Sequence, residues 1–168
     1  MFTFASTIRD GALPRWLPTA VVVLVAAALA VTGPGVADAA AQEPRVITIT
    51  PVGNQMEYEQ TEFTVAPGEE VRLVFENTAT SPAMRHNVVI LSSDDDAVVQ
   101  EVAQAAMAAS DTEYVPEHEA VLAATDMADP GETVAVTFTA PEEPGAYRYV
   151  CTFPGHWATM QGTMTVES

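Results

Sequence analysis

Apolar and polar residues alternate in short runs along much of the chain after residue 44. In the clearest run, Val71, Leu73 and Phe75 occupy every second position and alternate with Arg72, Val74 and Glu76. A period of two predicts a β-strand with one buried face. By this pattern, or by β-branched runs between turn residues, strands are predicted at residues 46–49, 62–65, 71–76, 88–91, 121–125, 134–138, 147–151 and 164–166.

Residues 93–109 carry apolar side chains at helical spacing instead. Ser93 or Asp94 can cap the helix, and the acidic residues that follow suit its positive N-terminal turn. The apolar face is expected to consist of Val98, Val102, Ala105 and Ala106. Residues 111–119 are predicted to form an exposed loop.

Many short strands separated by turn residues, with one helix inserted, predict an all-β Greek-key sandwich of about eight strands. The helix is expected to cover one edge of that sandwich. Tyr147, Tyr149 and Cys151 share one face of their strand, so the cysteine is expected to point into the core.

The chain has 168 residues, of which 48% are hydrophobic, enough for one domain and a leader. Residues 1–41 are interpreted as a secretory signal peptide, because Arg9 and Arg15 precede the apolar run 20–31 and small residues follow at 37–39. The alternative is a retained membrane anchor, although the run is shorter than the roughly 20 residues that a spanning helix needs. Residues 42–168 then form the folded domain.

Acidic residues outnumber basic ones, 23 to six, which gives a formal net charge of −17. Such a surface repels nucleic acid and anionic membranes, so neither is an expected partner. The acidity is consistent with general solubility, with a saline habitat, or with a basic protein partner.

The single cysteine, Cys151, excludes an intramolecular disulfide and any four-cysteine metal site. His156 and Met160 follow it at short spacing. Two imidazoles and one thiolate in a trigonal arrangement, with an axial thioether, suit one copper ion. The second imidazole is predicted to be His86, which precedes an apolar strand. His118, between two glutamates, is interpreted as a solvated loop residue.

The stretch CTFPGHWATM, together with MRHN, resembles the small blue copper proteins of the cupredoxin family, in particular the azurin and auracyanin branch. The resemblance runs from about Ile47 to Val166. It implies a cupredoxin-like sandwich and one copper ion cycling between Cu(I) and Cu(II). It also implies backbone N–H donors to the thiolate from Asn87 and Phe153. The resemblance implies equatorial copper ligands His86, Cys151 and His156 and an axial ligand Met160. It further implies an apolar docking patch for redox partners at Met56, Met84, Phe153, Pro154, Gly155 and Ala158.

Two departures from the azurin pattern bear on the site. Arg85 stands where azurins have a glycine whose carbonyl is a weak fifth ligand, so the Arg85 carbonyl is a candidate for that role. Trp157 follows His156 where a small residue is common, and it is expected to make the docking patch bulkier.

The candidate site is consistent with three classes of function. Electron transfer needs one enclosed copper ion, whereas copper storage or delivery uses clustered methionines and histidines on exposed segments. A copper enzyme would need more histidines than the three in this chain, so an enzyme is not expected. The sequence therefore predicts a secreted or periplasmic type 1 copper protein that carries single electrons, with copper storage or delivery as the alternative. Expected partners are redox proteins such as a c-type cytochrome or a membrane oxidoreductase. Contact with a membrane is expected only if the leader is retained.

Overall fold

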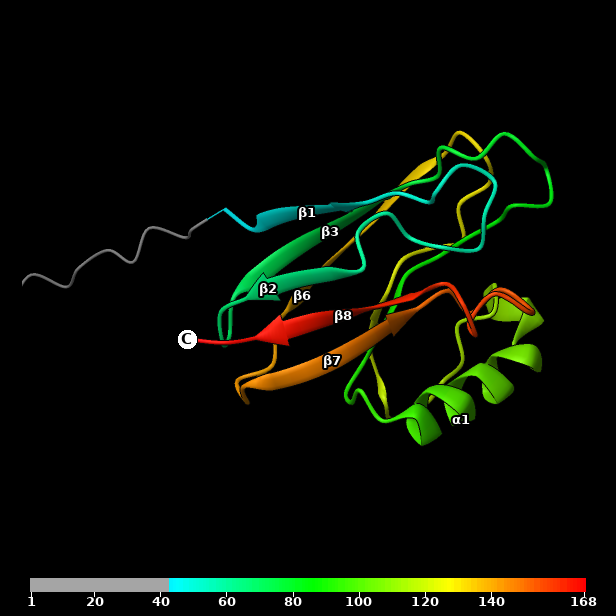
Figure 1. The fold of residues 1–168 in the computed structure, drawn as a ribbon. Coiled ribbons are helices and arrows are strands. Elements are labelled where there is room, and N and C mark those ends of the chain that lie inside the picture. Colours follow the sequence, from blue (N-terminus) through cyan, green and yellow to red (C-terminus); the bar gives the residue numbers. More distant parts are fainter. Residues whose placement is uncertain (1–42) are drawn as a thin grey trace, which may run out of the picture. The chain divides into compact units, whose positions relative to one another are not determined.

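The computed structural model of the chain describes residues 43–168, so the predicted leader at 1–41 lies outside the described residues. Figure 1 shows strands packed in two layers with a helix below them. The strands are β1 (Arg45–Ile49), β2 (Glu62–Val65), β3 (Glu70–Glu76), β4 (Val89–Leu91), β5 (Val121–Ala124), β6 (Thr133–Thr139), β7 (Gly145–Val150) and β8 (Gln161–Val166). The helix α1 spans Asp96–Met107, and a short 3-10 turn at Ser110–Thr112 interrupts the loop that follows. All eight predicted strands are present.

The strands form a three-stranded sheet, in the order β1-β3-β6, and a five-stranded sheet, in the order β2-β8-β7-β4-β5. The pairs β1/β3 and β2/β8 are parallel, and the remaining pairs are antiparallel. This arrangement confirms the predicted all-β sandwich. No helix among residues 43–168 combines the length and hydropathy that crossing a membrane requires.

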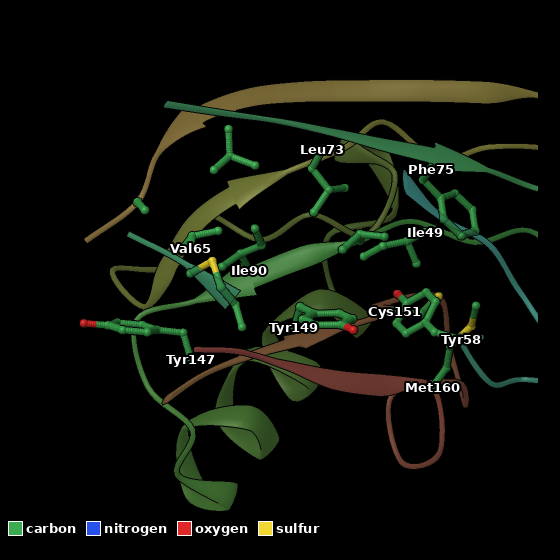
Figure 2. Packing of buried hydrophobic residues seen from close by; sticks show 14 of the residues in the cluster. Ile49, Tyr58, Val65, Leu73, Phe75, Ile90, Tyr147, Tyr149, Cys151 and Met160 are labelled. Atoms are coloured by element: carbon green, nitrogen blue, oxygen red, sulfur yellow. The ribbon is translucent and has the colours of Figure 1, made fainter. Parts of the chain in front are cut away.

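The main core lies between the two sheets, where the alternating strands turn their apolar faces toward one another. Val71, Leu73 and Phe75 of β3 are fully buried, as their period of two predicts. From the opposite sheet, Tyr149 packs against this layer, and Cys151 lies in the same cluster (Figure 2). The expectation that Cys151 points into the core is confirmed.

The predicted start of the helix was wrong by one or two residues. Asp95 is the N-cap, and its carboxylate accepts a hydrogen bond from the Ala97 N–H at 2.8 Å. The expected caps, Ser93 and Asp94, precede it. The buried face was also partly wrong, because it consists of Val99, Val102, Ala103 and Ala106.

The helix covers the outer face of the five-stranded sheet rather than an edge of the sandwich. Val89 and Leu91 of β4 and Val150 of β7 point to that face and form a second apolar cluster with the helix. The Arg148 guanidinium of β7 donates to the Asp94 carbonyl at 2.9 Å, which ties the start of the helix to the sheet. Strand β4 is therefore buried on both faces, as its continuous apolar sequence predicts.

Candidate metal centre

Three of the predicted ligands meet at the end of the sandwich where β4 begins and β7 ends. Cys151 directly follows β7, and His156 lies in the loop between β7 and β8. His86 precedes β4, which pairs antiparallel with β7 so that Val89 lies opposite Val150. Residues before β4 therefore lie beside residues after β7. This pairing brings His86 to the loop that carries the other two side chains.

The three donor atoms form a compact triangle. Cys151 Sγ lies 3.8 Å from His86 Nδ1 and 3.7 Å from His156 Nδ1, and the two Nδ1 atoms are 3.1 Å apart. The centre of this triangle is about 2.1 Å from each atom, within the roughly 2.0–2.3 Å that imidazole nitrogen and thiolate sulfur keep from a bound zinc ion. The residues present therefore fit one metal ion of this size, and the ligand types suit copper.

Burial gives the two imidazoles, His86 and His156, the neutral state that a metal site needs. His86 and Cys151 are fully buried, and His156 is 5% exposed. Burial, with a smaller contribution from the neighbouring His156, lowers the pKa of His86 from 6.5 to about 4. Burial also lowers the pKa of His156. Both imidazoles are thus neutral at neutral pH and have a lone pair available for a metal.

The cysteine is a thiol in the metal-free protein. Burial raises the pKa of Cys151 to about 12, and the backbone N–H groups of Asn87 and Phe153, which donate to the sulfur, partly oppose this effect. The same two residues were predicted to donate to the sulfur. A metal ion bound here would take Cys151 as the thiolate, so its binding would release one proton at neutral pH.

The two ligand-bearing segments are also joined by a buried polar contact. The Asn87 side chain accepts a hydrogen bond from the Thr152 N–H at 2.9 Å and donates to Thr152 Oγ1 at 2.8 Å. The Tyr58 hydroxyl donates to the Asn87 carbonyl at 2.5 Å. These contacts hold the segments before β4 and after β7 at a constant separation.

Met160, the predicted axial ligand, is fully buried at the same end of the core as Cys151 (Figure 2). Its carbonyl accepts from the Cys151 N–H at 3.0 Å, and its N–H donates to the His156 carbonyl at 2.9 Å. The backbone of the loop therefore holds the three candidate ligands in a fixed relation to one another.

Arg85 directs its side chain away from the buried donors and into an ion-pair group. Its Nε contacts Asp129 Oδ1 at 2.5 Å, and its Nη2 lies 3.8 Å from Glu113 Oε1. The charge of Arg85 is therefore balanced by two carboxylates. A ligand role for its backbone carbonyl stays a prediction.

The predicted docking residues are distributed around the rim of this end. Pro154, Gly155 and Ala158 are exposed, Phe153 is half-buried, and Met56 and Met84 line one shallow hollow. Trp157 is half-buried and packs partly against the cluster between the helix and the sheet. Its contribution to the bulk of the docking patch stays a prediction.

Three residues near the site, Thr152, Tyr58 and Tyr114, were not predicted from the sequence. Thr152 and Tyr58 hold Asn87, and the Tyr114 ring packs edge-on against Phe153 with the ring centroids 5.4 Å apart. No local pattern marks Tyr58 or Tyr114, since their contacts depend on distant segments. For Thr152, its place next to the cysteine was the only available signal. The loop histidine, His118, accepts a hydrogen bond from the Ala120 N–H and lies outside the donor cluster.

Comparison with known proteins agrees with this geometry. Residues 46–167 match the model of the copper-binding plastocyanin/azurin family. Auracyanin-A of Chloroflexus aurantiacus is 35% identical over 126 residues, covering 74% of this chain and 75% of that protein. Auracyanin-B of the same organism is 35% identical, covering 82% of this chain and 59% of that protein. The crystal structure of dithionite-reduced auracyanin from Roseiflexus castenholzii has a TM-score of 0.68 at 36% identity, covering 76% of this chain and all of that one. The resemblance inferred from the copper loop is thereby confirmed, and the chain belongs to the plastocyanin/azurin family of copper-binding proteins.

Proposed function

We propose that this protein carries single electrons between larger redox proteins, using one type 1 copper ion held by His86, Cys151, His156 and Met160. The observation that supports this most directly is the buried triangle of two imidazole nitrogens and one sulfur. A bound copper ion would supply reversible one-electron chemistry between Cu(I) and Cu(II).

The protein supplies a rigid and nearly dry site. Cys151 and Met160 are fully buried, and the loop that carries them is fastened by backbone hydrogen bonds. Cu(I) and Cu(II) favour different ligand arrangements. A site whose ligands move little therefore reduces the structural rearrangement that accompanies electron transfer. The N–H donors from Asn87 and Phe153 stabilise negative charge on the sulfur and thereby tune the reduction potential.

His156 is the expected point of electron exchange, since it is the only one of the three clustered donors with any exposed surface. The surrounding rim, with exposed Pro154, Gly155 and Ala158, is the proposed docking patch. A c-type cytochrome or a membrane oxidoreductase is the proposed kind of partner. An exported location, in the periplasm or outside the cell, accords with the charged and apolar pattern of residues 1–41.

A carrier rather than an enzyme is proposed because the chain offers few further ligands. Of the three histidines in the sequence, His118 is the only one outside the cluster, and it is engaged with the Ala120 N–H. A catalytic copper cluster next to the proposed site would need several more imidazoles.

The visible and EPR spectra of the purified protein with Cu(II) test this proposal. We expect an intense blue colour from thiolate-to-copper charge transfer, narrow copper hyperfine splitting, and full recovery after reduction and reoxidation. Cys151→Ser is expected to abolish the colour, because the transition needs sulfur. A variant that stays deep blue would refute the ligand assignment, and a weak, ordinary Cu(II) spectrum in the unmodified protein would favour copper storage or delivery.

A further inference from the structure

The turn after α1 has an unusual backbone at the copper end of the fold. Glu113 and Tyr114 both have positive φ angles, 54° and 63°, although neither is glycine. Consecutive non-glycine residues in the left-handed region are uncommon and persist where surrounding contacts compel them. Those contacts indicate what the turn holds in place.

Three segments hold the turn. The Tyr114 N–H donates to the carbonyl of Ala109, two residues beyond the end of α1, at 2.8 Å. One carboxylate oxygen of Glu113 accepts from the Met127 N–H at 3.3 Å, and the other lies 3.8 Å from Arg85 Nη2. Arg85 is the residue immediately before His86. The turn is thus tied to the segment that carries one of the proposed ligands.

The Tyr114 side chain reaches the other ligand-bearing segment. Its ring meets Phe153 edge-on, at a centroid separation of 5.4 Å and an interplanar angle of 77°. The centroid of the Phe153 ring in turn lies 4.9 Å from that of the His156 ring, at an interplanar angle of 54°. Tyr114, Phe153 and His156 therefore form a continuous series of ring contacts that leads from the turn to a proposed ligand.

Phe153 is the residue through which this contact acts on the site. Its carbonyl accepts from the His156 N–H at 3.0 Å, and its N–H donates to the Cys151 sulfur. Its ring is only half-buried, and Pro154 and Gly155, which follow it, are exposed. The contact with the Tyr114 ring therefore restrains Phe153, which itself contacts two proposed ligands, Cys151 and His156.

We propose that Tyr114 is a positioning residue of the copper centre, which holds Phe153 and through it the Cys151 sulfur and the His156 ring in their places. The Arg85–Glu113 pair keeps Tyr114 in this position. The inference deepens the proposed function, because its value for electron transfer rests on copper being bound there. The packing itself can be tested in the metal-free protein.

Amide hydrogen exchange at Phe153 in the metal-free full chain is the direct test. An aromatic pair is worth about 1 kcal/mol, so Tyr114→Ala is expected to speed this exchange about fivefold. Core amides such as that of Tyr149 should keep their exchange rates. Tyr114→Phe retains the ring and should restore the original rate at Phe153.

Two further variants keep the test decisive if Tyr114→Ala fails to fold. Glu113→Gln removes the charge opposite Arg85 and is expected to speed exchange at Phe153 about twofold, as loss of a weak ion pair would. Glu117→Gln makes the same chemical change at an exposed residue of the same loop and should leave the exchange rate at Phe153 unchanged.

The copper-loaded protein gives a second readout. Tyr114→Ala is expected to broaden the EPR hyperfine lines of bound Cu(II), because the His156 ring would adopt more than one orientation. Unchanged exchange at Phe153 together with an unchanged spectrum would overturn the proposal. If the unmodified protein with Cu(II) is not blue, the proposed function fails, whereas the exchange result still decides whether Tyr114 positions the loop.

Discussion

Replacing Asn87 with alanine should destabilise the metal-free protein strongly, because its amide is a buried link between the two ligand-bearing segments. Asn87 is fully buried, and its two shortest hydrogen bonds to Thr152 measure 2.8 and 2.9 Å. Alanine removes both bonds and leaves the buried Thr152 N–H without its acceptor. An unpaired buried donor costs about 1–3 kcal/mol and a lost hydrogen bond about 1 kcal/mol, so we expect a loss of about 3 kcal/mol in the free energy of unfolding.

Asn54 offers a matched control on the surface. Its side chain also joins two segments, with bonds to Thr80 Oγ1 at 3.1 Å, to the Thr80 N–H at 2.9 Å and to the Ser81 N–H at 3.0 Å. Asn54 is exposed, so water can replace these partners in Asn54→Ala. The loss there should stay below about 1 kcal/mol, although more bonds are removed.

Urea unfolding of both metal-free variants, followed by circular dichroism, measures the difference. The slope of the free energy against urea should stay unchanged, since neither substitution alters the surface exposed on unfolding. Equal losses at the two positions would refute the argument that burial sets the cost. In the copper-loaded protein, Asn87→Ala should also shift the visible absorption, because the segment whose N–H contacts the sulfur is no longer tied to Thr152.

Three other predictions concern the axial ligand, the packing of the core and acid stability. Met160→Leu should keep copper but raise the reduction potential, because a lost thioether donor favours Cu(I); voltammetry that gives an equal or lower potential would count against Met160 as a ligand. Gly162→Ala should lower the thermal midpoint, because the new Cβ would lie 2.2 Å from the Tyr149 ring, and overpacking of this kind costs about 1–3 kcal/mol; a midpoint equal to that of the unmodified protein would show that the ring can move aside. The metal-free protein should lose stability as the pH falls from about 6.5 toward about 4, because in that range His86 binds a proton more readily in the unfolded chain than in the fold. Urea midpoints measured across this pH range check the direction of the change in stability. A midpoint that rises on acidification would contradict the prediction.

The helix α1 shows which features a local sequence pattern can predict and which it cannot. Helical periodicity identified the segment that became α1, because the spacing of apolar residues reflects local backbone geometry. The cap at Asp95 and the exact buried face were missed. Each of the consecutive polar residues at 93–96 can cap a helix, so the local pattern does not distinguish among them. The contacts of Arg148 with Asp94 and Asp96 help to hold the helix start with Asp95 as the cap. The position of the helix over a sheet face depended on apolar residues of β4 and β7 that point outward.

The sequence by itself determined the features that depend on short spacings between residues. These are the strands and a loop in which Cys151, His156 and Met160 are close enough to share one ion. What only the tertiary structure decided was the partnership between distant segments. His86 and Cys151 are 65 residues apart, and the antiparallel pairing of β4 with β7 brings their donor atoms to 3.8 Å. The links from Asn87 to Thr152 and from Tyr114 to Phe153 arise in the same way. Such contacts depend on strand register and on how a helix and a loop pack over a sheet, and no spacing within one segment encodes them.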